Sequence, residues 1–500
     1  MAGVHRRPDI VQPPSGRPGG EGGSGRVATG DGARVRGRAW WVAAGALVAL
    51  GTGLRLLAAR GDLWLDEIWS LELARLAGSL GGVLTAVHHD NNHHLTTAWL
   101  LLLGPSAPPL ALRGLAVAAG AGTLAAVALR AGRVGRREAL AGVLLLSLSP
   151  FLVHYGSEAR GYSLAVLMAV VAAGALERWL DDRRPAWAAL LGVSATLGFL
   201  AHLTFLYVFV ALAAWGAAAW MAEPAPRRPP WALVAALGLP ALGFALLWAV
   251  DLRYLVVGGG PEYQAAQVLR ELLRATLGIP GGAAEALGVL AVAAAAWEIV
   301  RLGRERRPEW VFHVTALALA PALVLAWTRP DYLAPRYFAV AVPFFLLLLA
   351  RALARAWARG GWRRGAAAAA ILLFATGSAA RVGLLLRDGR GRYREAVEYM
   401  VRTGPPGGAG VASDNDFRNP VVLEFHARGV PGAHALRYVP AGGWAGPPPY
   451  WLLLHDFQES SQPPEGLVGP GGAHYRLDRT YRSAPLSGWN WSLYRLQAGP

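Results

Sequence analysis

The chain contains no cysteine and no lysine, so all 48 of its basic residues are arginine. The lack of cysteine excludes disulfide bonds, a cysteine nucleophile and thiolate metal sites, but it leaves the redox compartment undecided. Carboxylates are outnumbered, because 32 Asp and Glu residues leave a formal net charge of +16. Arginine in place of lysine, together with 62 glycines and 34 prolines, is typical of a GC-rich genome, and we expect a bacterial protein.

Extended polar sequence is scarce between the two ends of the chain. Hydrophobic residues make up 54% of the 500 residues, and the mean hydropathy is +0.33. Apolar runs of about twenty residues recur from Trp40 to Leu386, and a run of that length can cross a bilayer as a helix. The arginines cluster in the short loops between these runs, which indicates positive-inside topology rather than nucleic-acid binding.

The apolar runs predict an α-helical polytopic membrane protein with about eleven spans. Residues 1–38 are rich in Arg, Gly and Pro, and we expect a disordered cytoplasmic tail. The first span, Trp40–Ala59, is expected to be retained and to lead outward. The other predicted spans are 112–129, 139–154, 164–179, 186–200, 203–221, 231–250, 283–300, 310–327, 337–350 and 366–386. An odd number of spans places the C-terminus outside the plasma membrane.

Sequence patterns also predict helices and strands in the loops between the spans and in the segment after the last span. Ile68–Val87 has helical apolar spacing and predicts an amphipathic helix on the outer membrane surface, and His88–Gly104 predicts a second surface helix. Residues 251–282 form an external loop. The membrane domain is therefore 39–386, and 387–500 is a small extracytoplasmic α/β domain. In that domain we expect a helix at 393–401 and strands at 408–414, 434–440, 450–457 and 491–497.

Polar residues of the membrane domain gather in the loops predicted to lie outside, whereas the inner loops carry mostly Arg. Ionisable groups at a membrane boundary indicate function, so we expect one external cavity. The residues are Asp66, Glu67, His88, His89, Asp90, Asn91, Asn92, His93, His94, His154, Tyr155, Glu158, Arg160, Tyr162, His202, Arg336 and Tyr337.

Each group also has a structural interpretation. Asp66 and Glu67 suit the first turn of a helix, where carboxylates favour the positive end of the dipole. The HHDNNHH segment (88–94) reads as a polar loop or as a divalent-metal site, although it lacks HExxH spacing. Arg160 and Arg336 are candidates for headgroup anchoring or for phosphate binding, and His202 for helix packing. We assign no metal ligand.

Four motifs follow one another within 40–386: LWLDEIWSL, HHDNNHHLTTAWLLLLG, PFLVHYGSEARGYSLAVL and PRYFAVAVPFFLLLL. Together they resemble the GT-C membrane glycosyltransferases of the family 39 type. That family includes the protein O-mannosyltransferases and the bacterial aminoarabinose transferases that modify lipid A. The Asp-Glu pair and SEARGYS are the most specific parts. One departure, His93-His94-Leu95 where relatives often carry His-Pro-Pro, concerns the acceptor side of the pocket.

The resemblance implies an inverting transfer of a hexosyl or pentosyl group from a polyprenyl-phosphate donor to a cell-envelope glycan, glycolipid or protein. Asp66 and Glu67 are the expected catalytic pair, with Asp66 as the base or the carboxylate that orients the acceptor. Glu67 points about 100° away on a helix and would position Asp66 or a loop. Arg160 and Arg336 would bind the donor phosphate through their planar donor forks. The expected pocket residues are His93, His94, Glu158, Tyr162, His202 and Tyr337.

A transporter or flippase of lipid-linked sugars is the main alternative. Such a protein is expected to show paired repeats, broken helices and polar residues at mid-membrane. This sequence has no internal repeat and concentrates its polar residues on one face. A catalytically inactive scaffold is a third interpretation, which the intact Asp-Glu pair disfavours.

Overall fold

The computed structural model describes residues 29–224, 230–256, 264–279, 284–329, 333–443, 446–457 and 462–497, with side chains from Arg38 onward except at 284. Most of the predicted disordered tail (1–28), and Arg227 in a predicted inner loop, lie outside the described residues. The chain divides into two compact units, Met1–Ala43 and Ala44–Pro500. The described part of the first unit is the beginning of helix α1 (Thr29–Ala58), which starts before the predicted span.

Eight helical segments of the described residues are long and apolar enough to cross a membrane. They comprise α1, α6 (Gly114–Leu129) with α7 (Ala131–Val134), α10 (Tyr162–Asp182), η1 (Leu203–Phe205) with α12 (Leu206–Met221), α13 (Trp231–Val250), α15 (Ala284–Arg304), α16 (Glu309–Val314) with α17 (Ala320–Thr328), and α19 (Gly361–Asp388). A π-helical turn, Thr315–Leu319, joins α16 to α17.

The other three predicted spans are also helical, but they are shorter or more charged. They are α8 (Arg136–Leu148) with α9 (Pro150–Tyr155), α11 (Pro185–Ala201) and α18 (Val342–Arg359). The protein is therefore a mostly helical, multi-pass membrane protein with a small C-terminal sheet, and the number of eleven spans stays a prediction. Small residues allow the helices to pack closely. For example, a Cβ on Gly51 would come within 2.6 Å of Leu124 in α6.

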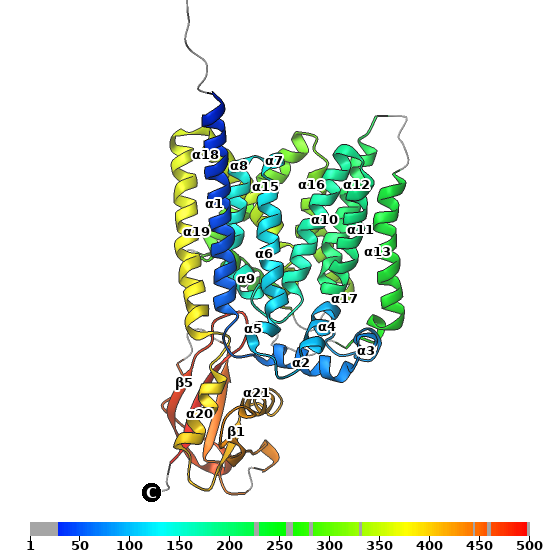
Figure 1. Ribbon diagram of the computed structural model, residues 1–500. Coiled ribbons are helices and arrows are strands. Elements are labelled where there is room, and N and C mark those ends of the chain that lie inside the picture. Colours follow the sequence, from blue (N-terminus) through cyan, green and yellow to red (C-terminus); the bar gives the residue numbers. More distant parts are fainter. Residues whose placement is uncertain are drawn as a thin grey trace, which may run out of the picture. The chain divides into compact units, whose positions relative to one another are not determined.

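Short helices lie across one end of the membrane helices, which we call the site end (Figure 1). They are α2 (Leu65–Ala77), α3 (Leu80–Thr85), α4 (His94–Leu103) and α5 (Pro109–Leu112). The prediction of one helix from Ile68 to Val87 is wrong in one respect. Gly78, with φ of 65°, ends α2, and the side chain of Ser79 begins α3 by accepting a hydrogen bond from the Gly82 amide. Within the predicted second surface helix, a helix is confirmed over His94–Leu103 (α4) but not over 88–93, and its location at the membrane surface stays a prediction. The predicted external loop contains a helix of its own, α14 (Ala265–Leu277).

The C-terminal domain is built on a six-stranded sheet with the order β2-β1-β3-β6-β5-β4. Strands β1 (Ala409–Ser413), β2 (Leu436–Tyr438) and β3 (Trp451–Asp456) are parallel, whereas the pairs joining β3, β6 (Asn490–Leu496), β5 (His474–Tyr481) and β4 (Gly466–Val468) are antiparallel. The four predicted strands and the helix α20 (Tyr393–Thr403) are confirmed. Strands β4 and β5 and helix α21 (Arg418–Ala427) were not predicted, since β4 is very short and the apolar alternation of β5 is interrupted at Asp478 and Arg479.

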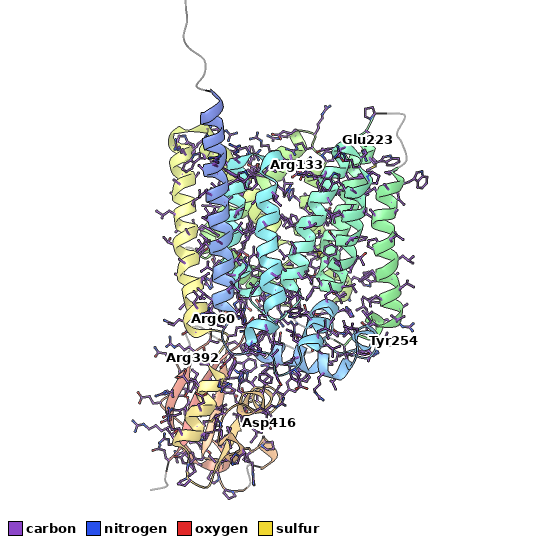
Figure 2. All side chains as sticks on the ribbon, in the orientation of Figure 1. Arg60, Arg133, Glu223, Tyr254, Arg392 and Asp416 are labelled. Carbon is purple, nitrogen blue, oxygen red and sulfur yellow. The ribbon has the colours of Figure 1, made fainter. Side chains whose placement is uncertain are left out.

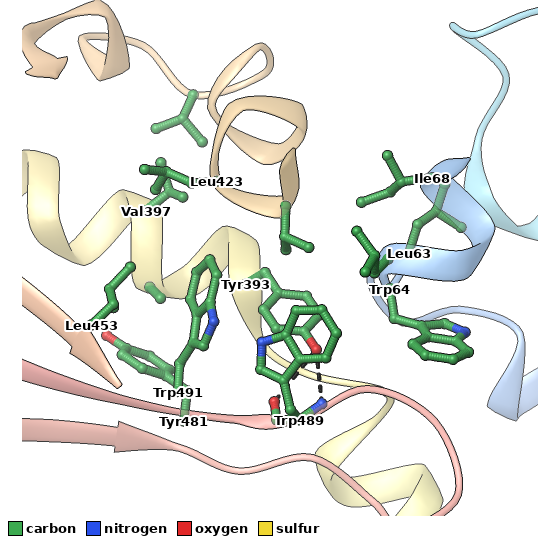
Figure 3. Close-up of a cluster of buried hydrophobic side chains, with 14 of the residues drawn as sticks. Leu63, Trp64, Ile68, Tyr393, Val397, Leu423, Leu453, Tyr481, Trp489 and Trp491 are labelled. Atoms are coloured by element: carbon green, nitrogen blue, oxygen red, sulfur yellow. Dashed lines mark hydrogen bonds between the residues drawn. The ribbon is translucent and has the colours of Figure 1, made fainter. Parts of the chain in front are cut away.

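The C-terminal domain and the surface helices share one hydrophobic core. Leu63, Trp64 and Ile68 belong to the same buried cluster as Tyr393 and Trp489 of the C-terminal domain (Figure 3). The Tyr393 hydroxyl donates to the Arg390 carbonyl at 2.9 Å and accepts from the Trp489 amide at 3.1 Å. Because apolar burial is the main stabilising contribution in such a contact, the domain is held firmly beside the start of α2.

Candidate active site

A cluster of three charged side chains lies at the site end. Asp66 is in the first turn of α2, Arg160 is in the turn between α9 and α10, and Arg336 is in a 3-10 helix, η5 (Pro335–Phe338), that precedes α18. Arg336 Nη2 lies 3.3 Å from Asp66 Oδ2, and Arg160 Nη1 lies 3.9 Å from the same oxygen. Arg160 Nη1 also donates to the Asp66 carbonyl at 3.3 Å. Two guanidiniums facing one carboxylate leave an excess positive charge, which suits an anionic ligand.

The cluster is partly open to solvent and has unused donors. The Asp66 and Arg336 side chains are each 20% exposed, whereas Arg160 is 8% exposed. The Nε atoms of both arginines are buried and have no hydrogen-bond partner among the described residues. Burial opposes the charge of Arg336, but the Asp66 carboxylate raises the pKa of Arg336 well above its ordinary value. Both arginines therefore remain charged and can donate to a further acceptor.

Glu67 is adjacent to Asp66 in sequence but has a different environment. Its side chain is fully buried and forms a two-point ion pair with Arg113, with Nε–Oε1 at 2.7 Å and Nη2–Oε2 at 2.6 Å. The backbone amide of Ala159 donates to Glu67 Oε1 at 2.8 Å. Burial by itself would raise the pKa of Glu67, but Arg113 lowers it below the usual value. Through these contacts Glu67 holds the turn at 157–160 (sequence SEAR) against α2. This is the geometry of a positioning residue.

His93 reaches the cluster through Ser70. Ser70 Oγ lies 3.4 Å from His93 Nε2 and accepts from Arg160 Nη1 at 3.4 Å. The other imidazole nitrogen lies 3.2 Å from Thr97 Oγ1. Burial and, next, Arg160 lower the pKa of His93 well below its ordinary value. His93 is therefore a neutral side chain that supports Ser70 and Arg160.

Three predicted pocket residues place aromatic rings beside the arginines. The Arg160 guanidinium lies 5.9 Å from the ring centre of Tyr162, and the Arg336 guanidinium lies 5.9 Å from that of Tyr337. The rings of Tyr162 and His202 are 4.4 Å apart between centroids. His202 Nδ1 accepts from the amide of Thr204 at 3.2 Å, and burial lowers the pKa of His202 to about 3. Tyr162 and His202 are buried and pack behind Arg160, whereas Tyr337 is half-buried beside Arg336.

The other two pocket residues are engaged elsewhere. His94 Nε2 lies 2.9 Å from Asp251 Oδ2, and His88 Nδ1 lies 2.9 Å from the second oxygen of that carboxylate. Glu158 accepts hydrogen bonds from Trp64 Nε1 and from Ser487 Oγ, both at 3.1 Å. His94 thus joins the HHDNNHH segment to the end of α13. In the part of the chain that the structure describes, no group of three or more His, Asp or Glu side chains is arranged to hold a metal ion.

Four buried residues around the site were missed by the sequence analysis: Arg113, Asp251, Arg390 and Ser487. Arg113 and Asp251 had a usable signal, because each is a single charge at the edge of an apolar run. Arg390 and Ser487 lie in a polar region where such residues are common, so no pattern distinguishes them.

No family model matches the chain, and no curated protein sequence matches it. The chain is similar to solved structures of ArnT from Cupriavidus metallidurans, in the apo state (14% identity, 84% of this chain and 93% of that chain, TM-score 0.49) and bound to undecaprenyl phosphate (13%, 92% and 99%, 0.46). It is also similar to the apo oligosaccharyltransferase of Archaeoglobus fulgidus (13%, 80% of this chain, TM-score 0.45), of whose length it covers 64%.

Proposed function

We propose that the protein is a GT-C-type glycosyltransferase that moves a sugar from a polyprenyl-phosphate donor to a cell-envelope acceptor at the outer face of the membrane. The observation that carries the proposal is the cluster of Asp66, Arg160 and Arg336. One partly exposed carboxylate beside two permanently charged guanidiniums provides a base and a phosphate site within a few ångströms. The sequence motifs that contain these residues support the same interpretation.

The donor phosphate would bind to the two arginines. Their Nε atoms have no partner within the described residues, and guanidinium groups bind phosphate through two parallel hydrogen bonds. The phosphate would compete with Asp66 for these donors and would thereby free the carboxylate to accept from an incoming hydroxyl. The lipid chain would remain in the bilayer, since the cluster lies at the end of the membrane helices.

The reaction would be a single displacement. The acceptor oxygen attacks the anomeric carbon, the carbon–oxygen bond to the phosphate breaks, and that electron pair leaves with the phosphate. Asp66 takes the proton of the acceptor hydroxyl. The arginines stabilise the negative charge that develops on the phosphate, and Tyr162 and Tyr337 border the pocket in which the oxocarbenium-like centre forms. One displacement inverts the anomeric configuration.

Transfer of a labelled sugar from a polyprenyl-phosphate donor by the purified protein tests the proposal. The acceptor would first be identified by mass spectrometry of envelope glycans and glycolipids in a deletion strain. Asp66→Asn keeps the side-chain shape, so we expect it to fold and bind donor but to lose turnover by about a hundredfold or more. Near-normal transfer by Asp66→Asn would overturn the role of Asp66 as the base, whereas donor movement across vesicle membranes without any transfer would favour the transporter alternative.

A further inference from the structure

The C-terminal domain inserts a short loop, Ala484–Gly488, between membrane helices. Ala484 packs in a buried cluster with Ala58 of α1, Val153 of α9 and Leu385 of α19. The Ala484 amide donates to the carbonyl of Gly389 at 2.8 Å. Pro485 and Leu486 line a cavity of about 20 Å³ together with residues of α9, α14 and α19. We call Ala484–Gly488 the inserted loop.

Backbone conformation at the inserted loop is unusual. Leu486 has a φ of 87°, in the left-handed region that residues with a side chain rarely occupy, and Gly488 has a φ of 79°. A Cβ on Gly488 would overlap the carbonyl oxygen of Arg390. A strained non-glycine residue persists only where its surroundings determine its conformation, and such residues concentrate at functional sites. The two unusual residues flank Ser487, whose side chain is turned into the membrane domain.

Ser487 begins a chain of contacts that ends at the proposed phosphate site. Its hydroxyl donates to Glu158 Oε2 at 3.1 Å, and its oxygen lies 2.6 Å from His154 Nε2. A serine hydroxyl has one proton, and Ser487 donates it to Glu158. The Ser487 oxygen therefore accepts a hydrogen bond from His154 Nε2. The other oxygen of Glu158 accepts from Trp64 Nε1 at 3.1 Å. The Arg336 guanidinium lies 5.8 Å from the Trp64 ring centre, and Arg336 contacts Asp66.

Burial makes this chain of contacts costly to disturb. Glu158 is fully buried, Ser487 and His154 are each 2% exposed, and Trp64 is 5% exposed. A carboxylate in such a place needs all of its hydrogen bonds, because a lost bond is not replaced by water. Loss of the Ser487 hydroxyl would therefore let Glu158 move, and Trp64 with it.

We infer that Ser487 is a positioning residue for the transferase site, through which the C-terminal domain orients Glu158, Trp64 and thereby Arg336. The inference rests on the proposed function, because it concerns the affinity of Arg336 for donor phosphate. It assigns the C-terminal domain a role in donor binding that does not require any residue of that domain to touch the donor.

Binding of undecaprenyl phosphate to the full-length protein in lipid nanodiscs tests the inference. Ser487→Ala and Trp64→Phe should each weaken binding by about tenfold, the scale of one buried hydrogen bond to a charged group. The double variant should bind no more weakly than the weaker single variant, because both changes interrupt one chain. Ser483→Ala is the matched control, since Ser483 lies nearby but among the described residues its side chain bonds to Asn490 alone, and donor binding by this variant should be unchanged.

Each other outcome has a definite meaning. Normal binding by a folded Ser487→Ala protein, or losses that multiply to about a hundredfold in the double variant, would overturn the inference and leave the proposed function standing. Absence of binding by the wild type would overturn the proposed function, and the inference would fall with it. Ser487→Thr keeps the hydroxyl and should restore part of the affinity. If Ser487→Ala does not fold, Trp64→Phe and Glu158→Gln test the same chain from the membrane domain, and normal binding by both would overturn it.

Discussion

The two ends of the membrane helices both bury charged side chains, but they balance them differently. At the end opposite the site, where Figure 2 labels Arg133 and Glu223, Arg351 bonds to Glu138 at 3.1 Å and to Glu309 at 3.3 Å. Glu309 also lies 3.5 Å from His313. At the site end, Arg160 and Arg336 share the single carboxylate of Asp66.

This difference separates structural from functional charge. The network of Arg351, Glu138 and Glu309 joins α18, α8 and α16, and Arg307 also pairs with Glu309 at 3.0 Å, so two guanidiniums face two carboxylates. A buried charge with matched partners ties helices together and has little affinity left for a ligand. The Asp66 cluster has excess positive charge, and its two arginine Nε atoms have no partner in the part of the chain that the structure describes, so it can bind an anion. Within the site end, the complete pair of Glu67 and Arg113 belongs with the structural networks.

The largest expected effect is the loss of stability when the buried ion pair of Glu67 and Arg113 is broken. Glu67→Gln leaves Arg113 buried without a counter-charge, so we expect the free energy of unfolding to fall by about 3 to 5 kcal/mol. Replacing both residues, as Glu67→Gln with Arg113→Met, should recover only part of that loss, because Arg113 also donates to the carbonyls of Ala59, Gly61 and Asp62. Thermal unfolding of the purified variants measures it, with Asp66→Asn as the comparison whose stability should fall less, because Asp66 and Arg336 are each 20% exposed. Activity of folded Glu67→Gln should be affected less than that of Asp66→Asn, and a melting temperature equal to wild type would contradict the structural assignment.

Removing one guanidinium of the unbalanced cluster should weaken donor binding. Loss of a charge-assisted hydrogen bond corresponds to about 1.5 to 3 kcal/mol, so Arg160→Ala and Arg336→Ala should each lower affinity by about ten- to a hundredfold. Lysine should rescue only partly, because it lacks the two-donor geometry. Arg351→Ala is the matched control from the opposite end and should reduce stability while leaving affinity unchanged. Unchanged donor binding by both Arg160→Ala and Arg336→Ala would contradict the phosphate role and favour the interpretation that these arginines anchor the protein to lipid headgroups.

A smaller effect is expected from pH. Burial holds the pKa of folded His93 well below the value of about 6.5 for an unfolded histidine, so the unfolded chain binds the extra proton first. The contribution of His93 to the free energy of unfolding is fully present above pH 6.5. It decreases as the pH falls, by up to about 1.4 kcal/mol per pH unit. Unfolding measured from pH 7.5 to 5 should show this slope added to that of the buried His202, and His93→Gln should reduce the total slope by the share of one histidine. The exposed His434→Gln variant should keep it, and an identical slope in all three proteins would contradict the prediction.

The smallest effect on the protein is expected from single cysteine substitutions, which test on which side of the membrane each end of the helices lies. The arginine distribution predicts Asp66, Arg160, Arg336 and the domain after Arg387 outside, with Arg136, Arg227, Arg306 and Arg363 inside. Single cysteines can be introduced cleanly because the chain has none. Exposed Arg60→Cys at the site end should react in intact cells, and exposed Arg363→Cys only after permeabilisation. Both should change stability by no more than about 0.5 kcal/mol. The reverse labelling pattern would put the proposed site on the wrong face.

Local patterns in the sequence determined the membrane class, the order of the helices and much of the C-terminal sheet. Apolar length and periodicity are properties of neighbouring residues, so they can be recognised without the fold. The gathering of Asp66, Arg160 and Arg336 was also predicted, because their loops were assigned to one side of the membrane. The helix break at Gly78 was not predicted, because it depends on the backbone conformation of a single residue. Strand β5 was not predicted, because its alternation of apolar and polar residues is weak.

Only the tertiary structure decided which charges are paired. Asp66 and Glu67 are adjacent in sequence. Arg113, 46 residues from Glu67, pairs with Glu67, whereas Asp66 pairs with the two arginines of the cluster. Asp251 meets His94 across 157 residues, and Ser487 meets Glu158 across 329. The physical reason is that the energy of a buried charge depends on every dipole and counter-charge packed around it. Those neighbours come from distant segments, so no local pattern in the sequence specifies them.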